Sequence, residues 1–339
     1  MKGFNPDLHH FQYLYNHLKD LDSEELTTWI NGAKANNPWF TAENVKLALD
    51  GIITLLEPES LKKFIHQYPI RNEIPKKVGV IMAGNIPAVG FHDLLCVLLS
   101  GNQLYAKLSS DDNFLLKKIA DVLFESDPLF RDRILFVDQL KHIEACITTG
   151  SDNSAKYFEY YFRNIPHVIR RNRTSVAILS GNEKDEELMD LGNDVFSYFG
   201  LGCRNVSHLL LPEGYSPVTI LKVWDEHFSH VSNHHKYMNN YEYNRAIFLI
   251  DQVTHFDNGY ILLKESESIF SSIATLTYSF YKDTDQIERL LDQKNEQLQC
   301  IVSKQKFRNN KTVSYGMSQK PLITDFADGV DTMKFLLEL

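Results

Sequence analysis

One cysteine stands in a sequence context that suits covalent catalysis. Cys203 follows two glycines in the stretch Gly200-Leu201-Gly202-Cys203, shortly before the apolar run Leu209–Leu211. Glycines let the backbone turn tightly and approach a ligand closely, and a thiol on such a turn can act as a nucleophile. The alternative is that Cys203 is a small buried apolar residue, the commonest role of a free cysteine.

Three polar stretches elsewhere could serve such a nucleophile. Asn85, in a Gly-Asn-Ile-Pro turn, has an amide that can donate to an oxyanion or form an Asx turn. Lys107, at the end of an apolar run, can meet phosphates or sugar hydroxyls, or simply extend along the surface. Gly150 and Ser151 precede a predicted helix, whose N-terminus can bind an anion, although a serine there also serves as an ordinary cap.

The elements that must position these residues alternate between strands and helices. Helices are predicted at 88–99, 113–124 and 153–162, and apolar runs predict strands at 78–83, 103–108, 134–137 and 145–147. This alternation indicates βαβ units in a parallel sheet, where ligands bind at the carboxyl ends of the strands. The sequence has no GxGxxG or P-loop pattern, so neither phosphate-binding fingerprint is supported.

The remaining segments predict a helical lead-in at about 6–69 and a second α/β unit. In that unit the expected strands are 176–179, 206–211, 259–263, 273–280 and 298–302, and the expected helices are 183–196, 216–228, 237–250 and 284–291. A loop at 315–321 leads to a terminal helix at 329–337. The basic cluster in 167–175 (Arg170, Arg171 and Arg173) is either a solvated loop or an anion contact.

Composition limits the class of protein. The chain has 339 residues, enough for two domains, and its net charge of −9 argues against binding nucleic acid through phosphate contacts. Four widely spaced cysteines without a CxxC pair make a zinc site unexpected and fit a reducing, cytoplasmic setting. The adjacent histidine pairs are poorly spaced for a metal. We expect neither a signal peptide nor a membrane span.

Taken together, these blocks resemble the aldehyde dehydrogenase superfamily and, within it, the acyl-CoA reductase (LuxC-like) family. The matching pieces, in order, are Val78–Ile81, Gly84–Pro87, Leu99–Asn102, Lys107–Ser110, Thr149–Ser151 and Gly200–Arg204. The resemblance implies an α/β, aldehyde-dehydrogenase-like fold with a Rossmann-type cofactor domain and an α/β catalytic domain. The expected division is a helical segment at 1–74, an NAD(P)-binding domain at 75–180 that 303–339 rejoins, and a catalytic domain at 181–302.

The resemblance also implies roles for single residues. Cys203 would be the nucleophile and Asn85 the oxyanion donor. The expected cofactor-binding residues are Lys107, Ser109, Ser110, Gly150, Ser151 and Glu267.

Within the cofactor set, Lys107 would bind the adenosine ribose, and Gly150 with Ser151 would face the diphosphate. Ser110 stands where many NAD-using relatives have an acid, which favours NADPH, with NADH as the alternative. Glu267 would hold the nicotinamide ribose, with Glu265 competing for that role.

One departure from the superfamily indicates the direction of the reaction. Aldehyde-oxidising members carry a water-activating glutamate in a Glu-Leu-Gly-Gly-Lys pattern, whereas the aligned residues 169–173 here contain no acid. A reductase must protect its acyl-enzyme from water. We therefore expect NAD(P)H-dependent reduction of an acyl-CoA to an aldehyde through an acyl-cysteine, by a homo-oligomer as in relatives. The alternatives are an acyl-phosphate reductase and a non-catalytic nucleotide-binding scaffold.

Overall fold

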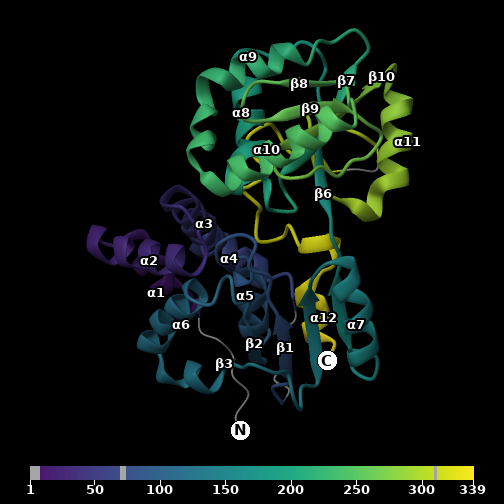
Figure 1. Ribbon diagram of the computed structural model, residues 1–339. Helices are drawn as coiled ribbons and strands as arrows, with labels where there is room; N and C mark the ends of the chain where they lie inside the picture. Colours follow the sequence, from purple (N-terminus) through teal and green to yellow (C-terminus); the bar gives the residue numbers. More distant parts are fainter. Residues whose placement is uncertain (1–7, 69–73, 309–310) are drawn as a thin grey trace. The chain divides into compact units, whose positions relative to one another are not determined.

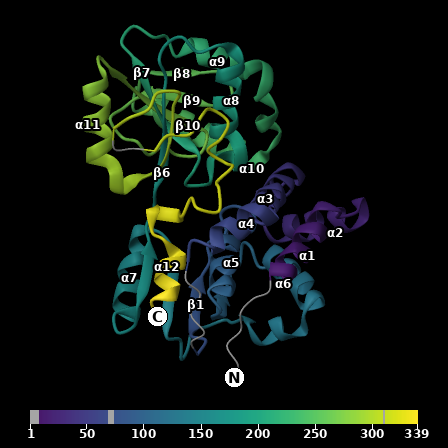
Figure 2. The ribbon, with the colours of Figure 1, turned by 180° about the vertical axis from the view of Figure 1, so that it is seen from behind.

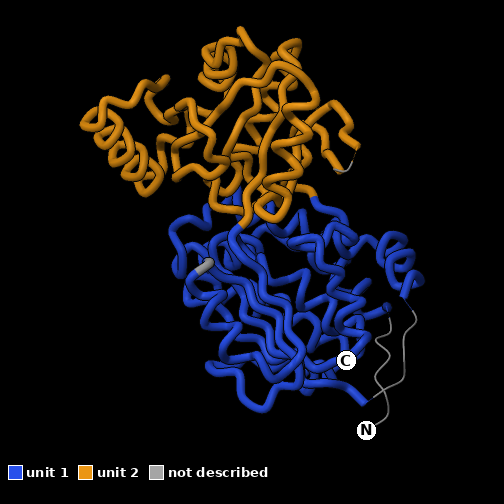
Figure 3. Tube along the Cα trace, turned by 90° about the vertical axis from the view of Figure 1, so that its right-hand side faces the viewer, with its two compact units in different colours: residues 1–172, 321–339 blue, residues 173–320 orange. Residues whose placement is uncertain are grey.

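The computed structural model describes residues 8–68, 74–308 and 311–339. The parts of our predictions that fall on residues 1–7, 69–73 and 309–310 lie outside the described residues. The chain forms two compact units (Figure 3): unit 1 comprises residues 1–172 and 321–339, and unit 2 comprises residues 173–320.

Unit 1 is built on a five-stranded parallel sheet, here called sheet A, in the order β3-β2-β1-β4-β5. Its strands are β1 (Lys77–Ile81), β2 (Gln103–Lys107), β3 (Ile134–Phe136), β4 (Ala145–Thr149) and β5 (His167–Arg170). Its connecting helices are α5 (Phe91–Leu99), α6 (Leu115–Ser126) and α7 (Asp152–Phe162), and α12 (Thr332–Leu337) comes from the chain's C-terminal part. The four predicted strands and three predicted helices are confirmed, and Figure 1 labels β1, β2, β3 and the three helices.

The N-terminal helices share the core of unit 1. They are α1 (Leu8–Lys19), α2 (Ser23–Asn36), α3 (Ala42–Leu55) and α4 (Pro58–Ile65). Asp22 caps α2 and Thr41 caps α3 through their side chains, as short polar residues do at helix starts. Phe11 and Val45 belong to the same buried cluster as Val78 of β1. Figure 2 shows α1 and α2 near α6, and both helices contact it.

Unit 2 contains a six-stranded sheet, sheet B, in the order β11-β6-β7-β10-β9-β8. Among the strands that the structure describes in this sheet, β8 and β9 pair antiparallel and the other neighbours pair parallel. The strands are β6 (Thr174–Ile178), β7 (Val206–Pro212), β8 (His255–Asp257), β9 (Leu262–Glu265), β10 (Thr275–Tyr281) and β11 (Leu298–Val302). The helices are α8 (Asp185–Phe196), α9 (Val218–His227), α10 (His235–Ile250) and α11 (Thr284–Lys294).

Short 3-10 helices complete the described structure: η1 (Pro128–Asp132), η2 (Ser197–Gly200), η3 (Ser229–Asn233), η4 (Asn295–Gln297) and η5 (Ala327–Gly329). Within the described ranges, no helix is both long and apolar enough to cross a membrane.

Several predicted element starts are wrong for one physical reason. The helix predicted from residue 88 begins at Phe91, because Ala88 has a φ of 52°, and the terminal helix predicted from residue 329 begins at Thr332, after Gly329 at 68°. The strand predicted from residue 259 begins at Leu262, because Gly259 has a φ of 92°. Left-handed backbone cannot continue either a right-handed helix or a strand.

The reading of the basic cluster as a solvated loop or an anion contact is wrong for Arg170. This residue ends β5, and its guanidinium is buried in a two-bond ion pair with Asp93 of α5, at 2.6 and 2.8 Å. It also donates to Thr332 of α12 at 3.0 Å. Burial lowers the pKa of Arg170, but the neighbouring Asp93 carboxylate outweighs this effect and raises it. The charge of Arg170 is therefore paired inside unit 1 and does not contact a ligand.

Candidate functional site

The carboxyl edge of sheet A gathers the sequence-predicted residues of unit 1. Ile81, the last residue of β1, is paired with Lys107 of β2 on one side and with Thr148 of β4 on the other. Parallel strands in this register end at the same level, so the segments that follow them share one edge. The predicted residues at this edge are Asn85, Lys107, Ser109, Ser110, Gly150 and Ser151.

The loops after β1 and β2 touch one another. A Cβ added to Gly84 would lie 2.7 Å from both Cβ and Oγ of Ser109 and 3.1 Å from the backbone nitrogen of Asp112. The position therefore requires glycine, because such contacts are shorter than real Cβ atoms make. Asn37 donates to the Gly84 carbonyl at 3.4 Å. Asn85 follows on this supported loop, and its side chain is exposed.

Lys107 and its following serines present hydrogen-bonding groups beside that loop. The Lys107 ammonium donates to the carbonyl of Asp138 at 3.1 Å, which fixes a cation at the end of β2. Ser109 Oγ accepts from the backbone N–H of Asp111 at 3.2 Å, and Ser110 is exposed.

Ser151 is the N-cap of α7. Its Oγ accepts from the backbone N–H of Ser154 at 3.3 Å, so the capping role is confirmed. A Cβ on Gly150 would lie 3.0 Å from the side chains of Phe158 and Ser154, which lets the turn approach the helix closely. A lysine, hydroxyls and a helix N-terminus along one sheet edge are the donors that the ribose and diphosphate of a dinucleotide require.

Cys203 belongs to unit 2, in a turn immediately before β7. Its side chain is exposed, whereas Cys96, Cys146 and Cys300 are buried. The alternative that Cys203 is a buried apolar residue is therefore wrong. The turn is closed by a bond from the Asn205 N–H to the Gly202 carbonyl at 3.1 Å, and Ser175 of β6 donates to the Cys203 carbonyl at 3.0 Å.

Asn205 holds the Cys203 turn from inside. Its side-chain oxygen accepts from the Gly202 N–H at 2.8 Å. Its amide nitrogen donates to the carbonyls of Asp194 and Val195 at 3.2 Å and of Ser197 at 2.8 Å. Asn205 is only 2% exposed, so these bonds satisfy carbonyls that the end of α8 leaves without helical partners.

The segment leading into the turn is strained. Tyr198, Phe199 and Gly200 all have left-handed backbone, with φ values of 52°, 57° and 77°. Such angles are unfavourable for residues with a Cβ, and packing offsets this cost. The Tyr198 side chain is buried, and the Phe199 ring lies 4.4 Å from the ring of His234 between centroids. Persistent strain of this kind is concentrated at functional sites.

The tail segment, residues 313–318, supports the other side of the Cys203 turn. The buried carboxylate of Asp194 accepts from the N–H groups of Gly316 at 2.7 Å and Ser318 at 2.9 Å. The Ser318 carbonyl in turn accepts from the Arg204 guanidinium at 3.3 Å. Burial raises the pKa of Asp194 to about 6, with the two backbone donors opposing the rise.

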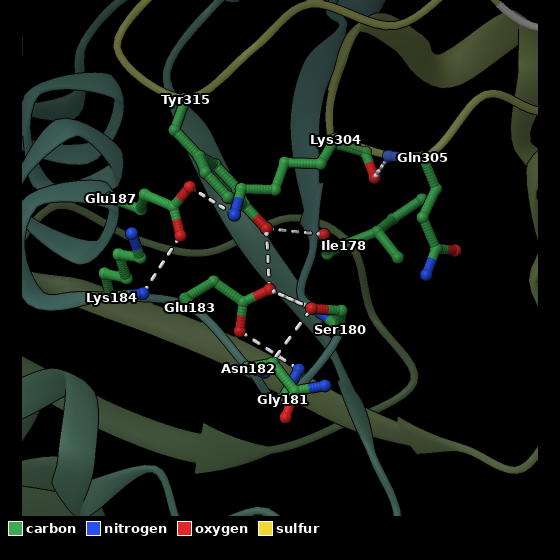
Figure 4. Close-up of polar contacts among 11 residues, drawn as sticks. Ile178, Ser180, Gly181, Asn182, Glu183, Lys184, Glu187, Lys304, Gln305 and Tyr315 are labelled. Carbon is green, nitrogen blue, oxygen red and sulfur yellow. Dashed lines mark hydrogen bonds and ion pairs between the residues drawn. The ribbon is translucent and has the colours of Figure 1, made fainter.

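Glu183 fastens the tail segment to the carboxyl end of β6 (Figure 4). Its carboxylate accepts from the N–H and Oγ of Ser180 at 2.6 and 2.7 Å, and from the N–H of Gly181 at 3.0 Å. Tyr315 donates to the same carboxylate at 3.3 Å and to the Ile178 carbonyl at 2.9 Å. This acid at a sheet edge is thus engaged in fastening a loop.

His208, five residues after Cys203, is a buried side chain within sheet B. Its Nδ1 lies 2.9 Å from Thr277 Oγ1 and its Nε2 lies 3.0 Å from Ser279 Oγ. Burial lowers its pKa to about 4, so the ring is neutral at pH 7. Both ring nitrogens are engaged, which gives His208 a structural role in the sheet.

Glu267 lies in the loop after β9 and is exposed, as is its competitor Glu265 at the end of the strand. Both belong to unit 2. Across the described ranges, no group of three His, Cys, Asp or Glu residues could hold a metal ion.

Sequence reasoning missed the residues that shape the loops, namely Asn205, Asp194, Ser175 and Asp112. Each acts on backbone groups of another segment. The one sequence signal was the position of Asn205, two residues after the candidate nucleophile.

Known structures define the class of this fold. An aldehyde dehydrogenase from Bacillus cereus in complex with NAD+ matches with a TM-score of 0.62 and 12% identity, over 89% of this chain and 71% of that chain. A putative aldehyde dehydrogenase from Burkholderia cenocepacia matches with a TM-score of 0.64 and 11% identity, over 88% and 74%. Aldehyde dehydrogenase 21 from Physcomitrella patens, in complex with succinate, matches with a TM-score of 0.61 and 14% identity, over 88% and 73%. The chain therefore has the aldehyde-dehydrogenase fold, as predicted.

The match to a sequence family covers less of the chain than the structural matches do. The sequence model of the family described as acyl-CoA reductase (LuxC) matches residues 12–156, which confirms the predicted resemblance to that family. No curated protein sequence matches. The family match and the fold together support an aldehyde-related oxidoreductase that uses a nicotinamide cofactor.

Proposed function

We propose that the protein reduces an acyl-CoA thioester to an aldehyde, with NADPH as the preferred reductant, through an acyl group carried on Cys203. The observation that carries this proposal is the exposed Cys203 thiol on a turn held by Asn205, Ser175 and the tail segment. Unit 1 would bind the cofactor, and unit 2 would supply the nucleophile.

Cys203 acts first as a nucleophile. Its thiolate attacks the thioester carbonyl carbon and forms a new C–S bond, and the electron pair moves to the carbonyl oxygen. The Asn85 amide and the Cys203 N–H would donate to that oxyanion. When the carbonyl re-forms, the bond to the CoA sulfur breaks, and CoA leaves as a thiolate that takes a proton from solvent. The acyl group is then a thioester on Cys203.

The cofactor site in this proposal is the carboxyl edge of sheet A. Lys107, Ser109 and Ser110 would hold the adenosine ribose, and Gly150 with Ser151 would hold the diphosphate at the N-terminus of α7. Glu267 would hold the nicotinamide ribose. Ser110 offers a hydroxyl where an acid would repel a 2′-phosphate, which favours NADPH over NADH. When bound, the reduced nicotinamide supplies the hydride that converts the thioester carbon to the aldehyde level. Cys203 then leaves as the thiolate.

The stretch at 169–173 supports reduction rather than oxidation. It contains no acid, and Arg170 within it is committed to Asp93. Without a base in this stretch to activate water, the acyl-cysteine survives until it is reduced.

The test supplies NADPH with either an acyl-CoA or an acyl phosphate and follows the absorbance of NADPH. We expect oxidation with acyl-CoA, loss of that oxidation in Cys203→Ser, and retention in the buried control Cys300→Ser. Asn85→Ala should lose about 10²–10³-fold in kcat, as for one oxyanion donor. Turnover with acyl phosphate alone would identify the other reductase, and full activity in Cys203→Ser would refute the covalent route.

We also propose that the protein is a homo-oligomer, as its resemblance to the family implies. Light scattering coupled to size-exclusion chromatography measures this directly, and a monomeric mass at micromolar concentration would refute it.

A further inference from the structure

Asp112 is a buried carboxyl group in the loop between β2 and α6. Only 2% of the residue is exposed, although aspartate is rarely buried to this extent. The same loop carries Ser109 and Ser110, and the backbone N–H of Asp112 donates to the Ser109 carbonyl at 3.3 Å. Asp112 takes no part in the proposed mechanism.

The carboxylate reaches into the neighbouring loop, the one after β1. Asp112 Oδ2 accepts from the backbone N–H of Ala88 at 2.6 Å. Ala88 follows Asn85 by three residues and has a left-handed φ of 52°, which is unfavourable for alanine. A short hydrogen bond therefore holds a strained backbone in the loop that carries Asn85.

The two loops are also in direct contact. Gly84 is so close to Ser109 and to the Asp112 nitrogen that no side chain fits there. The Asp112 side chain thus binds the loop after β1, while its backbone N–H binds Ser109 in its own loop.

We propose that Asp112 is a positioning residue that couples the cofactor-side loop at Ser109 and Ser110 to the loop that carries Asn85. Binding of the cofactor's adenosine ribose at the first loop then fixes the oxyanion donor on the second. The catalytic role of this coupling rests on the proposed function, but the connection between the two loops can be measured without catalysis.

The variants are Asp112→Ala, which removes the carboxylate, and Asp112→Asn, which keeps its size and one acceptor oxygen. The matched control is Asp121→Asn on α6, where an exposed acid lies 3.8 Å from Lys118. We expect Asp112→Ala to raise the NADPH dissociation constant about tenfold, the factor that one hydrogen bond supplies. It should also slow the first-turnover release of CoA, while iodoacetamide alkylation of Cys203 proceeds at the wild-type rate.

Hydrogen exchange provides the readout that a merely structural role would not change. In wild type and in Asp121→Asn, NADPH should protect the peptide covering 83–90 as well as that covering 108–114. In Asp112→Ala, or in Asp112→Leu if the alanine variant does not fold, protection of 83–90 should be lost while 108–114 remains protected at saturating NADPH. Asp112→Asn should keep the protection of 83–90, because it still offers an oxygen to the Ala88 N–H.

Two results would overturn the coupling. One is equal protection of 83–90 in wild type and in the variant that lacks the acceptor oxygen; the other is a uniform loss in every readout that tracks unfolding. Failure of the proposed function is separate. It would appear as NADPH binding by wild type without any release of CoA, and the exchange experiment would still decide the role of Asp112.

Discussion

Replacement of Asn205 by aspartate tests the organisation of the Cys203 turn most sharply, because the two side chains have nearly the same shape. The asparagine amide nitrogen donates to the carbonyls of Asp194, Val195 and Ser197. Aspartate would place an oxygen against these three carbonyl oxygens. Asn205→Ala instead removes all four side-chain bonds, including the one from the Gly202 N–H.

The expected losses follow from these contacts. Net contributions of about 0.5–1.5 kcal/mol for each of the four neutral hydrogen bonds give roughly 2–6 kcal/mol for Asn205→Ala. The aspartate variant should lose about 3–5 kcal/mol, because it also buries a carboxylate that lacks a cationic partner in this bond set. The same change at Asn240 is the control, since its amide makes a single 2.8 Å bond to the Lys236 carbonyl and should cost less than about 1.5 kcal/mol.

Urea denaturation measures the free energy of unfolding, and iodoacetamide labelling with peptide mapping measures the reactivity of Cys203. We expect slower labelling of Cys203 in Asn205→Asp even where more than nine-tenths of the protein is folded, because the turn no longer holds the thiol. If Asn205→Asp unfolded at the wild-type urea concentration and labelled at the wild-type rate, the assignment of Asn205 as the support of this turn would be wrong.

Three further predictions concern single groups. Burial raises the pKa of Asp112 to about 7, above about 3.9 in the unfolded chain. Relative to Asp112→Asn, wild type should therefore lose stability as pH rises from 4 to 7, by at most about 1.4 kcal/mol per pH unit. Urea titrations measure this, and parallel curves of stability against pH for the two proteins would contradict it. Asp93→Asn should lower the free energy of unfolding by roughly 3–5 kcal/mol, because it leaves Arg170 buried without its charged partner. Glu159→Gln, in the exposed pair with Arg171, should lower it by less than about 1 kcal/mol. Equal losses in urea denaturation would refute this contrast. Gly200→Ala should cost about 1–2 kcal/mol because its φ is 77°, and an unchanged melting temperature would contradict that reading.

The sequence predicts most of the fold because apolar runs identify buried parallel strands. It fails at β5, where His167-Val168-Ile169-Arg170 offers two apolar residues beside a basic cluster. A buried arginine is recognised as part of a strand only when its partner is known, and Asp93 lies 77 positions earlier in the chain. The short edge strand β8 (His255–Asp257) was missed because it has a single apolar residue.

For the candidate site, residue chemistry predicts what a side chain can do but not what holds it in place. The sequence indicates Cys203, Asn85 and Lys107 because they carry a thiol, an amide and an ammonium group after a glycine or at a strand end. Asn205 and Asp112 bind backbone atoms of other segments, and tertiary structure alone brings those atoms within reach. A left-handed Ala88 gives no sequence signal at all, since alanine usually avoids that conformation.

The buried ion pair also limits which residues can stand in the stretch 169–173, which contains no acid. An acid at position 170 would face the Asp93 carboxylate in a site where Arg170 is 5% exposed. Two carboxylates so placed cannot both ionise without a large cost, and Thr332 would lose its guanidinium donor. A glutamate cannot therefore replace Arg170 unless α5 and the packing of α12 change with it. The core of unit 1 therefore excludes an acid at position 170, whereas Ile169 occupies the position that aligns with the glutamate of the Glu-Leu-Gly-Gly-Lys pattern.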